Sequence, residues 1–327
     1  MQAGIIGLGN LGTAVGNLIA ENGHDVLGWE YDATAVAAIN EQHANERYLP
    51  GVPLSARLRA TDDLAAAFAY GRVVFITLPS VFIEPTLGPL RGRVDPDTLI
   101  VNTAKGIDAA TGLTAFQLLG RLFPDNRLVM LSGPSVANEF ARHLPTTVVI
   151  AGPSRADLLT VARLLDNDTF RTRFSDDTAG VELGGILKNI YAIGLGLFDG
   201  RDIRSVNFRA VYLTIALEEI ARFGVAMGAR IETFLYLSGI GDLLATSLSE
   251  HSHNRRLGEL LARGLRLPEI RAEMGVLPEG YNTLQAVLYL AEKQHVSLPL
   301  AKGLWDVIND RYPAERFINS FIKDFVE

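Results

Sequence analysis

Two lysines, an aspartate and a threonine have the residue types of a proton-transfer site. Lys188 lies in the middle of the apolar run "GVELGGILKNIYAIG", with Gly184 and Gly185 one helical turn before it. Burial and a neighbouring positive charge both lower the pKa of a lysine towards the range in which it exchanges protons. An ordinary helical lysine extends into water. Here the small residues leave room for a ligand and Asn189 adds a polar neighbour, so Lys188 is a candidate general acid and base.

Lys105 and Asp242 are candidates for the same site. Lys105 follows an apolar strand in "IVNTAKG", and ligands of open α/β sheets bind at the carboxyl ends of the strands. The segment "LSGIGDLLATS" contains Asp242 and, four residues later, Thr246 on the same helical face. A carboxylate orients or neutralises an ammonium, and a hydroxyl holds a substrate oxygen. The alternative is that Asp242 only caps the N-terminus of a helix.

The segment "SEHSHNRRLG", residues 249–258, indicates an anion site. It contains two histidines followed by an asparagine and two arginines, and these last three residues begin the apolar helical pattern "NRRLGELLARG". Side chains and backbone amides together bind phosphate at such a helix start. His251 has no evident partner and is expected at the surface. The two histidines lack carboxylates at a ligand spacing, so we predict no metal site.

A glycine-rich turn near the N-terminus indicates dinucleotide binding. In "GIIGLGNLG", Gly7 allows a tight turn, Gly9 lets the backbone approach a pyrophosphate, and Gly12 lets a helix pack closely on a strand. Such glycine patterns alone are weak evidence. Here the pattern follows the first strand, and Glu30 closes the second strand 23 residues after Gly7.

Glu30 favours NAD over NADP. A carboxylate at this position accepts a hydrogen bond from a ribose 2′-hydroxyl and repels a 2′-phosphate. The surrounding residues "WEYDA" contain no cation that would hold such a phosphate. Asp32 takes the ribose role if the strand ends later, and a solvated strand end is the alternative for either carboxylate.

The elements that must position these residues form two regions. Residues 1–178 alternate helical patterns with short apolar runs such as "RVVFITLP" and "RLVMLSG", which suit a parallel sheet covered on both faces. Residues 179–327 show the 3.6-residue periodicity of helices, with hardly a strand signal. We therefore predict a doubly wound, Rossmann-type α/β domain and an all-helical substrate domain, packed together around a cleft.

Composition excludes several classes of protein. The chain has 327 residues, a net charge of −7 and 48% hydrophobic residues, which fits neither disorder nor a basic nucleic-acid binder. It contains no cysteine, as suits a reducing cytoplasm. Its N-terminus lacks the basic region of a signal peptide. The apolar run around Lys188 is interrupted by polar residues and is shorter than the roughly 20 residues of a membrane span. We predict a cytoplasmic protein that binds neither membrane nor nucleic acid.

Over nearly its whole length, the chain resembles the NAD(P)-dependent glycerol-3-phosphate dehydrogenases of the bacterial type. The resemblance lies in a series of motifs in the order and spacing of that family: "GLGNLGTAV", "ERYLPGVPL", "ATDDLAAAF", "TLPS", "TAKGID", "LSGPSVANEFA", "VELGGILKNIYAIGLGLFDG", "GIGDLLATS", "SHNRRLGELLARG" and "PEGYNTLQAV". It implies interconversion of dihydroxyacetone phosphate and sn-glycerol 3-phosphate, a homodimer and a role in glycerophospholipid precursor synthesis.

The resemblance also implies a role for particular residues. Lys188 is the proton donor and acceptor at the substrate carbonyl, and Lys105 lies between cofactor and substrate. The other residues expected at the substrate, a small phosphate ester, are Gly133, Ser135, Asn189, Asp242, Thr246, Ser252, His253 and Asn254. Those expected at the cofactor, beside the three glycines and Glu30, are Asn10, Leu11, Tyr31, Pro79, Ala137, Arg255, Leu277 and Glu279.

The chain departs from the family pattern in three respects. Asn10 and Leu11 replace the usual Ser-Trp, and we expect this change to affect only packing. Tyr31 replaces an arginine expected to meet a 2′-phosphate, which again favours NAD. His253 replaces the arginine expected on the substrate phosphate, and a histidine is only partly charged near neutrality. Asn254 and the helix start then hold the phosphate with His253, and Arg255 or Arg256 is a possible substitute for the missing guanidinium.

Two alternatives remain at this stage. An enzyme of the same architecture could act on another hydroxyacid or on an opine, with His253 marking the loss of phosphate binding. A non-catalytic NAD sensor could carry the same glycine turn. The presence of both Lys188 and Asp242 argues against the sensor, since binding without turnover does not require a proton-transfer pair.

Overall fold

The structure of this chain is a computed structural model that describes residues 1–108, 111–249 and 252–325. The chain divides into two compact units. The first comprises residues 1–104 and 115–181, and the second comprises residues 105–114 and 182–327. Residues 105–108 and 111–114 therefore belong to the second unit, although they follow a strand of the first.

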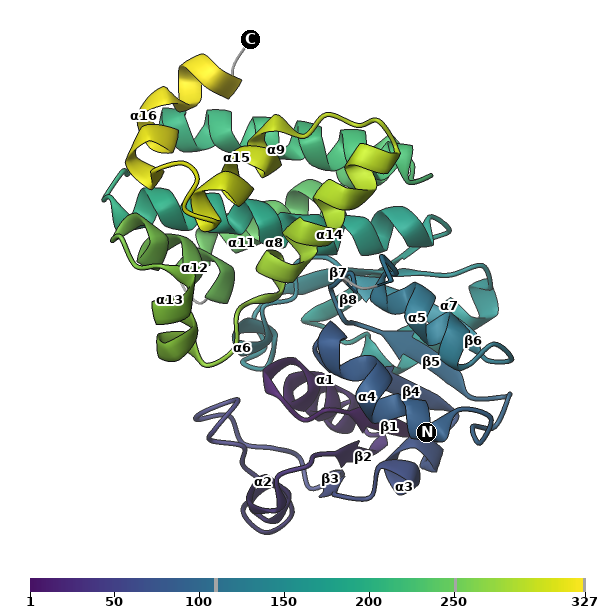
Figure 1. The fold of residues 1–327 in the computed structure, drawn as a ribbon. Helices are drawn as coiled ribbons and strands as arrows, with labels where there is room; N and C mark the ends of the chain where they lie inside the picture. Colours follow the sequence, from purple (N-terminus) through teal and green to yellow (C-terminus); the bar gives the residue numbers. More distant parts are fainter. Residues whose placement is uncertain (109–110, 250–251, 326–327) are drawn as a thin grey trace. The chain divides into compact units, whose positions relative to one another are not determined.

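The first unit is built on one eight-stranded sheet (Figure 1). Its strands are β1 (Gln2–Ile6), β2 (Asp25–Trp29), β3 (Leu58–Thr61), β4 (Val73–Ile76), β5 (Leu99–Asn102), β6 (Arg127–Ser132), β7 (Thr146–Ala151) and β8 (Phe170–Ser175). They lie in the order β3-β2-β1-β4-β5-β6-β7-β8, and every neighbouring pair is parallel except β6 and β7. The strand order reverses between β1 and β4, the place where such sheets bind their ligands.

Helices cover both faces of this sheet. They are α1 (Asn10–Glu21), α2 (Ala33–Ala37), α3 (Leu64–Ala69), α4 (Ile83–Leu87), α5 (Ala115–Leu122), α6 (Ala137–Phe140) and α7 (Arg155–Leu165). A π-helical turn (Ala38–Gln42) and two 3₁₀ turns (Ser80–Phe82 and Gly88–Leu90) complete the unit. Side-chain caps fix where several helices begin: Asp63 accepts from the Ala66 amide before α3, and Ser154 from the Asp157 amide before α7.

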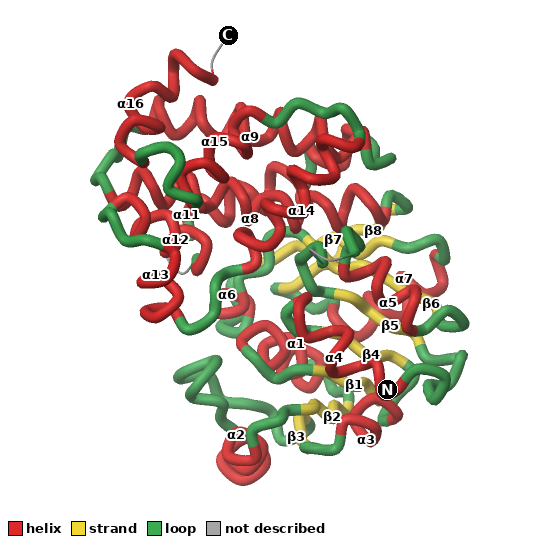
Figure 2. Tube along the Cα trace, viewed as in Figure 1, coloured by secondary structure: helices red, strands yellow, loops and turns green. Residues whose placement is uncertain are grey.

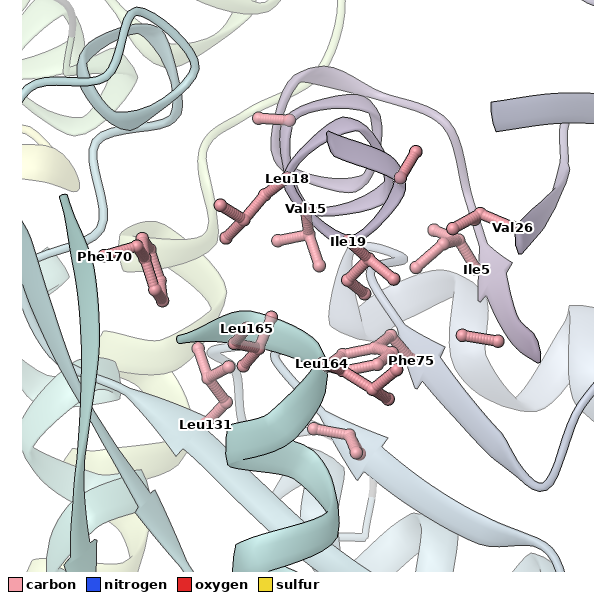
Figure 3. Close-up of a cluster of buried hydrophobic side chains, with 14 of the residues drawn as sticks. Ile5, Val15, Leu18, Ile19, Val26, Phe75, Leu131, Leu164, Leu165 and Phe170 are labelled. Atoms are coloured by element: carbon pink, nitrogen blue, oxygen red, sulfur yellow. The ribbon is translucent and has the colours of Figure 1, made fainter. Parts of the chain in front are cut away.

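Successive strand residues point into two separate hydrophobic cores. Ile5 and Phe75 pack with α1 and α7, whereas Ile6 and Ile76 pack with α3, α4 and α5. Figure 3 shows the first core, in which Val15, Leu18 and Ile19 of α1 face the strands beside Leu164 and Leu165 of α7. Helices cover both faces of the sheet, so side chains on both faces are apolar. The strands therefore lack the alternation of apolar and polar residues seen when one face meets water. The predicted doubly wound α/β fold is confirmed.

The second unit is helical, as Figure 2 shows by colour. Its helices are α8 (Thr178–Gly200, whose first turn belongs to the first unit), α9 (Val206–Ala226), α10 (Ile231–Phe234), α11 (Asp242–Leu248), α12 (His253–Ala262), α13 (Leu267–Met274), α14 (Glu279–Lys293), α15 (Pro299–Ile308) and α16 (Ala314–Phe325). A π-helical turn (Leu237–Gly241) precedes α11, and an isolated β-bridge joins Ile107 to Thr114. The predicted helical C-terminal region is confirmed.

Helix α8 is the central helix of the second unit. Among the described helices it alone is long and apolar enough to cross a membrane, but 89% of its most apolar window is buried inside the protein. The core helix of a globular protein has the same properties. Phe198 near its end packs edge-on against Phe208 and Tyr212 of α9, and Phe321 of α16 joins the same aromatic cluster.

The first core gives a stability prediction. Leu164→Ala removes a fully buried side chain of α7 and should lower the free energy of unfolding of the first unit by about 2–5 kcal/mol. Leu159→Ala, on the same helix but 41% exposed, is the control and should change it by less than about 0.5 kcal/mol. Chemical denaturation of the two variants checks this, and equal losses would contradict the burial assignment.

Candidate active site

One buried carboxylate holds both candidate lysines in the second unit. The Lys188 Nζ donates to Asp242 Oδ1 at 2.5 Å, and the Lys105 Nζ donates to Asp242 Oδ2 at 2.8 Å. Lys188 also donates to Thr246 Oγ1 at 2.6 Å. The side chain of Asp242 is 2% exposed, and those of Lys188 and Lys105 are 13% and 16% exposed. The structure thus brings together the four residues that the sequence singled out for proton transfer.

Close packing of α8 on the π-helical turn before α11 creates this arrangement. A Cβ on Gly184 would lie 2.2 Å from the backbone oxygen of Ser238, so only glycine permits the contact. One helical turn later, Lys188 reaches Asp242, the first residue of α11. The expectation that Gly184 leaves room for a ligand is therefore wrong, because the backbone of Ser238 takes that space. The capping alternative for Asp242 is also wrong: Gly241 is the N-cap residue, and the Asp242 carboxylate binds the two lysines.

The pKa of Lys188 falls from 10.5 to about 8. Burial is the largest cause, and the positive charge of Lys105 acts in the same direction, whereas Asp242 opposes both. The direction is the one expected from the sequence. At pH 7 roughly one amine in ten is then neutral, so both protonation states are accessible close to physiological pH.

A second buried network fixes α8 in place. The Tyr191 hydroxyl, one turn beyond Lys188, donates to Glu219 Oε2 at 2.9 Å, and burial raises the pKa of Glu219. The same carboxylate accepts from the amides of Leu300 and Ala301 at 2.6 and 3.0 Å, at the start of α15. Glu219 therefore links α8, α9 and α15. Sequence reasoning missed it, because a glutamate in an amphipathic helix usually faces water.

The candidate phosphate segment begins α12. Ser252 is its N-cap and accepts from the Arg255 amide at 3.3 Å. The side chain of His253 is exposed at the first position of the helix. Asn254 Oδ1 accepts from the Gly280 amide at 2.9 Å, which ties this segment to the start of α14. The predicted cofactor residues Leu277 and Glu279 lie directly before that contact in the chain, whereas His251 lies outside the described residues.

Both arginines of this segment are engaged by the protein itself. The Arg255 Nε and Nη2 donate to Asp199 Oδ2 at 2.8 and 2.6 Å, and its Nη1 donates to the carbonyls of Ser247 and Ser249. Arg256 pairs with two glutamates, Glu259 at 3.2 Å and Glu273 at 2.7 Å. Arg255 therefore links the end of α11 to α8. Neither guanidinium is free to substitute for the missing arginine in this conformation, contrary to the suggestion from the sequence.

The glycine turn of the first unit has the geometry that a dinucleotide requires. Gly7 has a φ of +103°, and a Cβ on Gly12 would lie 1.9 Å from the Gly7 oxygen. A Cβ on Gly9 would meet no atom within 4 Å, and no side chain caps the start of α1 at this residue. Open space before uncapped helix amides fits a pyrophosphate. Thr77 fixes the turn by donating to the oxygens of Ile6 and Gly7 at 3.0 and 2.7 Å.

Two carboxylates follow β2. Glu30 is buried, 3% exposed, and its burial raises its pKa. Asp32 caps α2 by accepting from the side chain and the amide of Thr34, and these hydrogen bonds lower the pKa of Asp32. Tyr31 between them is 69% exposed. Arg47 lies 2.8 Å from Asp32, so a cation is present beside this strand end. The sequence does not reveal this cation, because Arg47 lies 15 residues from Asp32 in the chain.

The side chain of Asn10 bonds to two distant segments. Its Nδ2 donates to the Tyr48 carbonyl at 2.5 Å and to Asn138 Oδ1 at 3.1 Å. The expectation that the change to Asn10 affects only packing is therefore wrong. Leu11 beside it packs against the edge of the first core.

The remaining predicted residues of the first unit lie in turns after strands. Gly133 follows β6 with a φ of +106°, and Ser135 Oγ donates to its oxygen at 3.0 Å. Ala137 is buried at the start of α6, and Pro79 is exposed after β4. Asn189, in the second unit, is buried next to Lys188 on α8. Their roles stay predictions. No group of three or more His, Cys, Asp or Glu side chains among the described residues could hold a metal ion.

Comparisons with known proteins match nearly the whole length of the chain. Residues 2–157 match the family model described as NAD-dependent glycerol-3-phosphate dehydrogenase N-terminus, and residues 177–319 match the model for its C-terminus. Curated relatives of this chain are named glycerol-3-phosphate dehydrogenase [NAD(P)+], and two of them serve as examples. The one from Carboxydothermus hydrogenoformans is 38% identical over 93% of this chain and 91% of its own length. The one from Ectopseudomonas mendocina is 40% identical over 93% and 89%.

A solved structure agrees with these matches. The crystal structure of glycerol-3-phosphate dehydrogenase from Coxiella burnetii superposes with a TM-score of 0.91 at 29% identity, and the match covers 98% of each chain. Sequence and fold thus lead to the same group of proteins: the chain belongs to the family of NAD-dependent glycerol-3-phosphate dehydrogenases.

Proposed function

We propose that this chain interconverts sn-glycerol 3-phosphate and dihydroxyacetone phosphate with NAD(H), and that Lys188 is its general acid and base. The observation that carries the proposal is the buried amine of Lys188, whose pKa of about 8 lies close to physiological pH. A proton-transfer group is most effective when its pKa lies near the working pH. Family membership supports the activity itself.

The hydrogen bonds of Lys188 suggest how the proton moves. An ammonium has three N–H donors, and two of these bond to Asp242 and Thr246. We assign the third to the oxygen of the substrate carbonyl. NADH held at the glycine turn would supply the hydride for the carbonyl carbon, and NAD⁺ would accept it in the reverse direction. As negative charge develops on the oxygen, Lys188 donates a proton from Nζ; in the reverse direction its neutral amine takes the hydroxyl proton.

The neighbours of Lys188 set the pKa and the direction of its amine. Asp242 accepts from both ammonium groups and so fixes the direction of the Lys188 side chain. Lys105 keeps that carboxylate from neutralising Lys188 fully, which allows the pKa of Lys188 to fall. Asn189, Gly133 and Ser135 are proposed as further substrate contacts.

For the substrate phosphate we propose Ser252, His253, Asn254 and the amide groups at the start of α12. Asn254 is held by the Gly280 amide, and His253 is exposed, so the segment combines a fixed polar side chain with an accessible imidazole. For the cofactor we propose the glycine turn and Glu30. The open space at Gly9 and the uncapped start of α1 support the pyrophosphate contact.

Further parts of the proposal rest on the sequence patterns and on the family resemblance. Residues 1–178 form the dinucleotide-binding domain and residues 179–327 the substrate domain. The enzyme acts as a homodimer in the cytoplasm and supplies a precursor of glycerophospholipids. The identities of 38–40% to dehydrogenases named for glycerol 3-phosphate favour this substrate over another hydroxyacid or an opine. The proton-transfer cluster favours an enzyme over an NAD sensor.

The substrate assignment has a direct test. With NADH as cofactor, we expect kcat/KM for dihydroxyacetone phosphate to exceed that for unphosphorylated dihydroxyacetone by at least about a hundredfold, because the phosphate makes several charge-assisted hydrogen bonds. Activity on unphosphorylated ketones alone would support the other-substrate alternative. NADH binding without oxidation in a single turnover would support the sensor.

Lys188→Met tests the proton-transfer group. The substitution keeps the length and apolar character of the stem but removes the amine, so kcat should fall by about 10²–10⁴-fold in both directions. NADH binding, followed by fluorescence, should be retained. The matched control is Lys302→Met on α15, an exposed lysine whose side chain is 54% accessible and whose loss should leave kcat unchanged. A Lys188→Met enzyme with near-normal kcat would exclude this role.

The pH dependence of the two directions should be opposite. Reduction needs the ammonium form of Lys188, so kcat/KM for dihydroxyacetone phosphate should fall as pH rises through about 8. Oxidation needs the neutral amine, so kcat/KM for glycerol 3-phosphate should rise through the same range. Lys105→Met removes a neighbouring positive charge and should shift both profiles to higher pH. Profiles that are unchanged in Lys105→Met would contradict the coupling of the two amines.

His253 gives a separate prediction for substrate binding. His253→Ala removes the exposed imidazole at the start of α12 and, with it, the hydrogen bond that we assign to the substrate phosphate. The KM for dihydroxyacetone phosphate should therefore rise by about threefold or more, while NADH binding stays unchanged. An unchanged KM would count against direct contact between His253 and the phosphate.

A further inference from the structure

Arg47 places a positive charge at the carboxyl end of β2. Its Nη1 lies 2.8 Å from Asp32 Oδ2, and its guanidinium lies 5.0 Å from the centre of the Tyr48 ring. The Arg47 side chain is 58% exposed, so one side of the guanidinium faces solvent while the other is held by the protein. The residue comes from the segment between the π-helical turn and β3, at a distance of 15 residues from Asp32 in the chain.

The backbone on both sides of Arg47 is tied to the glycine turn. Two residues before it, the buried Asn45 donates from Nδ2 to the Leu8 carbonyl at 2.9 Å and to Thr13 Oγ1 at 2.8 Å. One residue after it, the Tyr48 carbonyl accepts from Asn10 at 2.5 Å. These bonds are made to the turn and first helix turn that would receive the pyrophosphate. The chain is therefore held on both sides of Arg47, whereas the Arg47 side chain itself is largely exposed.

The charges around Arg47 bear on the ribose 2′ position of a bound cofactor. In doubly wound folds this position lies at the end of the second strand, where a carboxylate binds a 2′-hydroxyl or an arginine binds a 2′-phosphate. Here both kinds of group are present, because Glu30 and Asp32 close β2 and Arg47 lies beside Asp32. An exposed ion pair contributes little to stability. A phosphate forms stronger, charge-assisted hydrogen bonds and can therefore displace Asp32 as the partner of Arg47.

We propose that Arg47 is the residue that binds the 2′-phosphate of a phosphorylated cofactor: its guanidinium leaves Asp32 and pairs with the phosphate, and this contact sets how well NADPH competes with NADH. Asp32 opposes this binding, both as the competing partner of Arg47 and as a like charge near the phosphate. The proposal rests on the dinucleotide site described under the proposed function. It assigns to Arg47 the role that the arginine missing at position 31 was expected to play.

A binding experiment without turnover tests Arg47. Calorimetry measures the affinity of the full chain for 2′,5′-ADP and for 5′-AMP, which differ only in the 2′-phosphate. The parent protein should bind both. Arg47→Ala should lower the affinity for 2′,5′-ADP by about tenfold or more, because one charge-assisted contact is lost. It should lower the affinity for 5′-AMP by less than about threefold. The ratio of kcat/KM for NADPH to that for NADH should fall to a similar extent.

Two further variants test whether the charges near the 2′ position control the choice between the two nucleotides. Asp32→Asn keeps an N-cap residue for α2 but removes the charge, so it should raise the affinity for 2′,5′-ADP relative to 5′-AMP. Arg57→Ala is the matched control, because Arg57 is about as exposed as Arg47 and pairs with Asp25 at the opposite end of β2. It should leave the ratio unchanged.

Specific outcomes would overturn the proposal. If Arg47→Ala lowered the affinity for both nucleotides equally, the guanidinium would stack on adenine or merely order the loop. Unchanged affinities, or a parent protein that does not bind 2′,5′-ADP, would also exclude it. A chain that binds the nucleotides but does not reduce dihydroxyacetone phosphate would instead contradict the proposed function and leave the assignment of Arg47 intact.

Discussion

The shared carboxylate of Asp242 is the constraint on which the chemistry of the second unit depends. A buried charge is costly unless it is paired, and a buried lysine beside a single carboxylate would keep its proton firmly. Here one carboxylate serves two ammonium groups, so the cluster carries a net positive charge in a site largely shielded from water. Burial and Lys105 outweigh the attraction of Asp242, and the pKa of Lys188 falls although its partner is only 2.5 Å away.

Most of the fold could be predicted from the sequence because its signals are local. The apolar strands, the glycine turn and the helical periodicity after residue 178 each lie within a few residues, and the structure has the predicted doubly wound sheet and helical C-terminal region. Lys188 was recognisable for the same reason: a lysine inside an apolar helix needs an explanation. Its closeness to Asp242 was expected only because a carboxylate can orient or neutralise an ammonium.

The missed features depend on contacts between residues far apart in the chain. Arg47 reaches Asp32 through a loop that Asn45 and Asn10 anchor, and nothing in the residues around Glu30 indicates this. Gly184 and Arg255 were misread because a small residue or a cation in a sequence does not reveal whether protein or ligand occupies the space beside it. In the structure Gly184 meets the backbone of Ser238, and Arg255 meets Asp199.

The central claim is that burial and a shared carboxylate make Lys188 a proton donor near neutral pH. It is tested most directly by observing the amine itself, through NMR titration of the protein with ¹³C label at the lysine ε-carbons, assigned by comparison with Lys188→Met. The account predicts that the Lys188 resonance titrates near pH 8. A midpoint at the ordinary lysine value of 10.5 would contradict it.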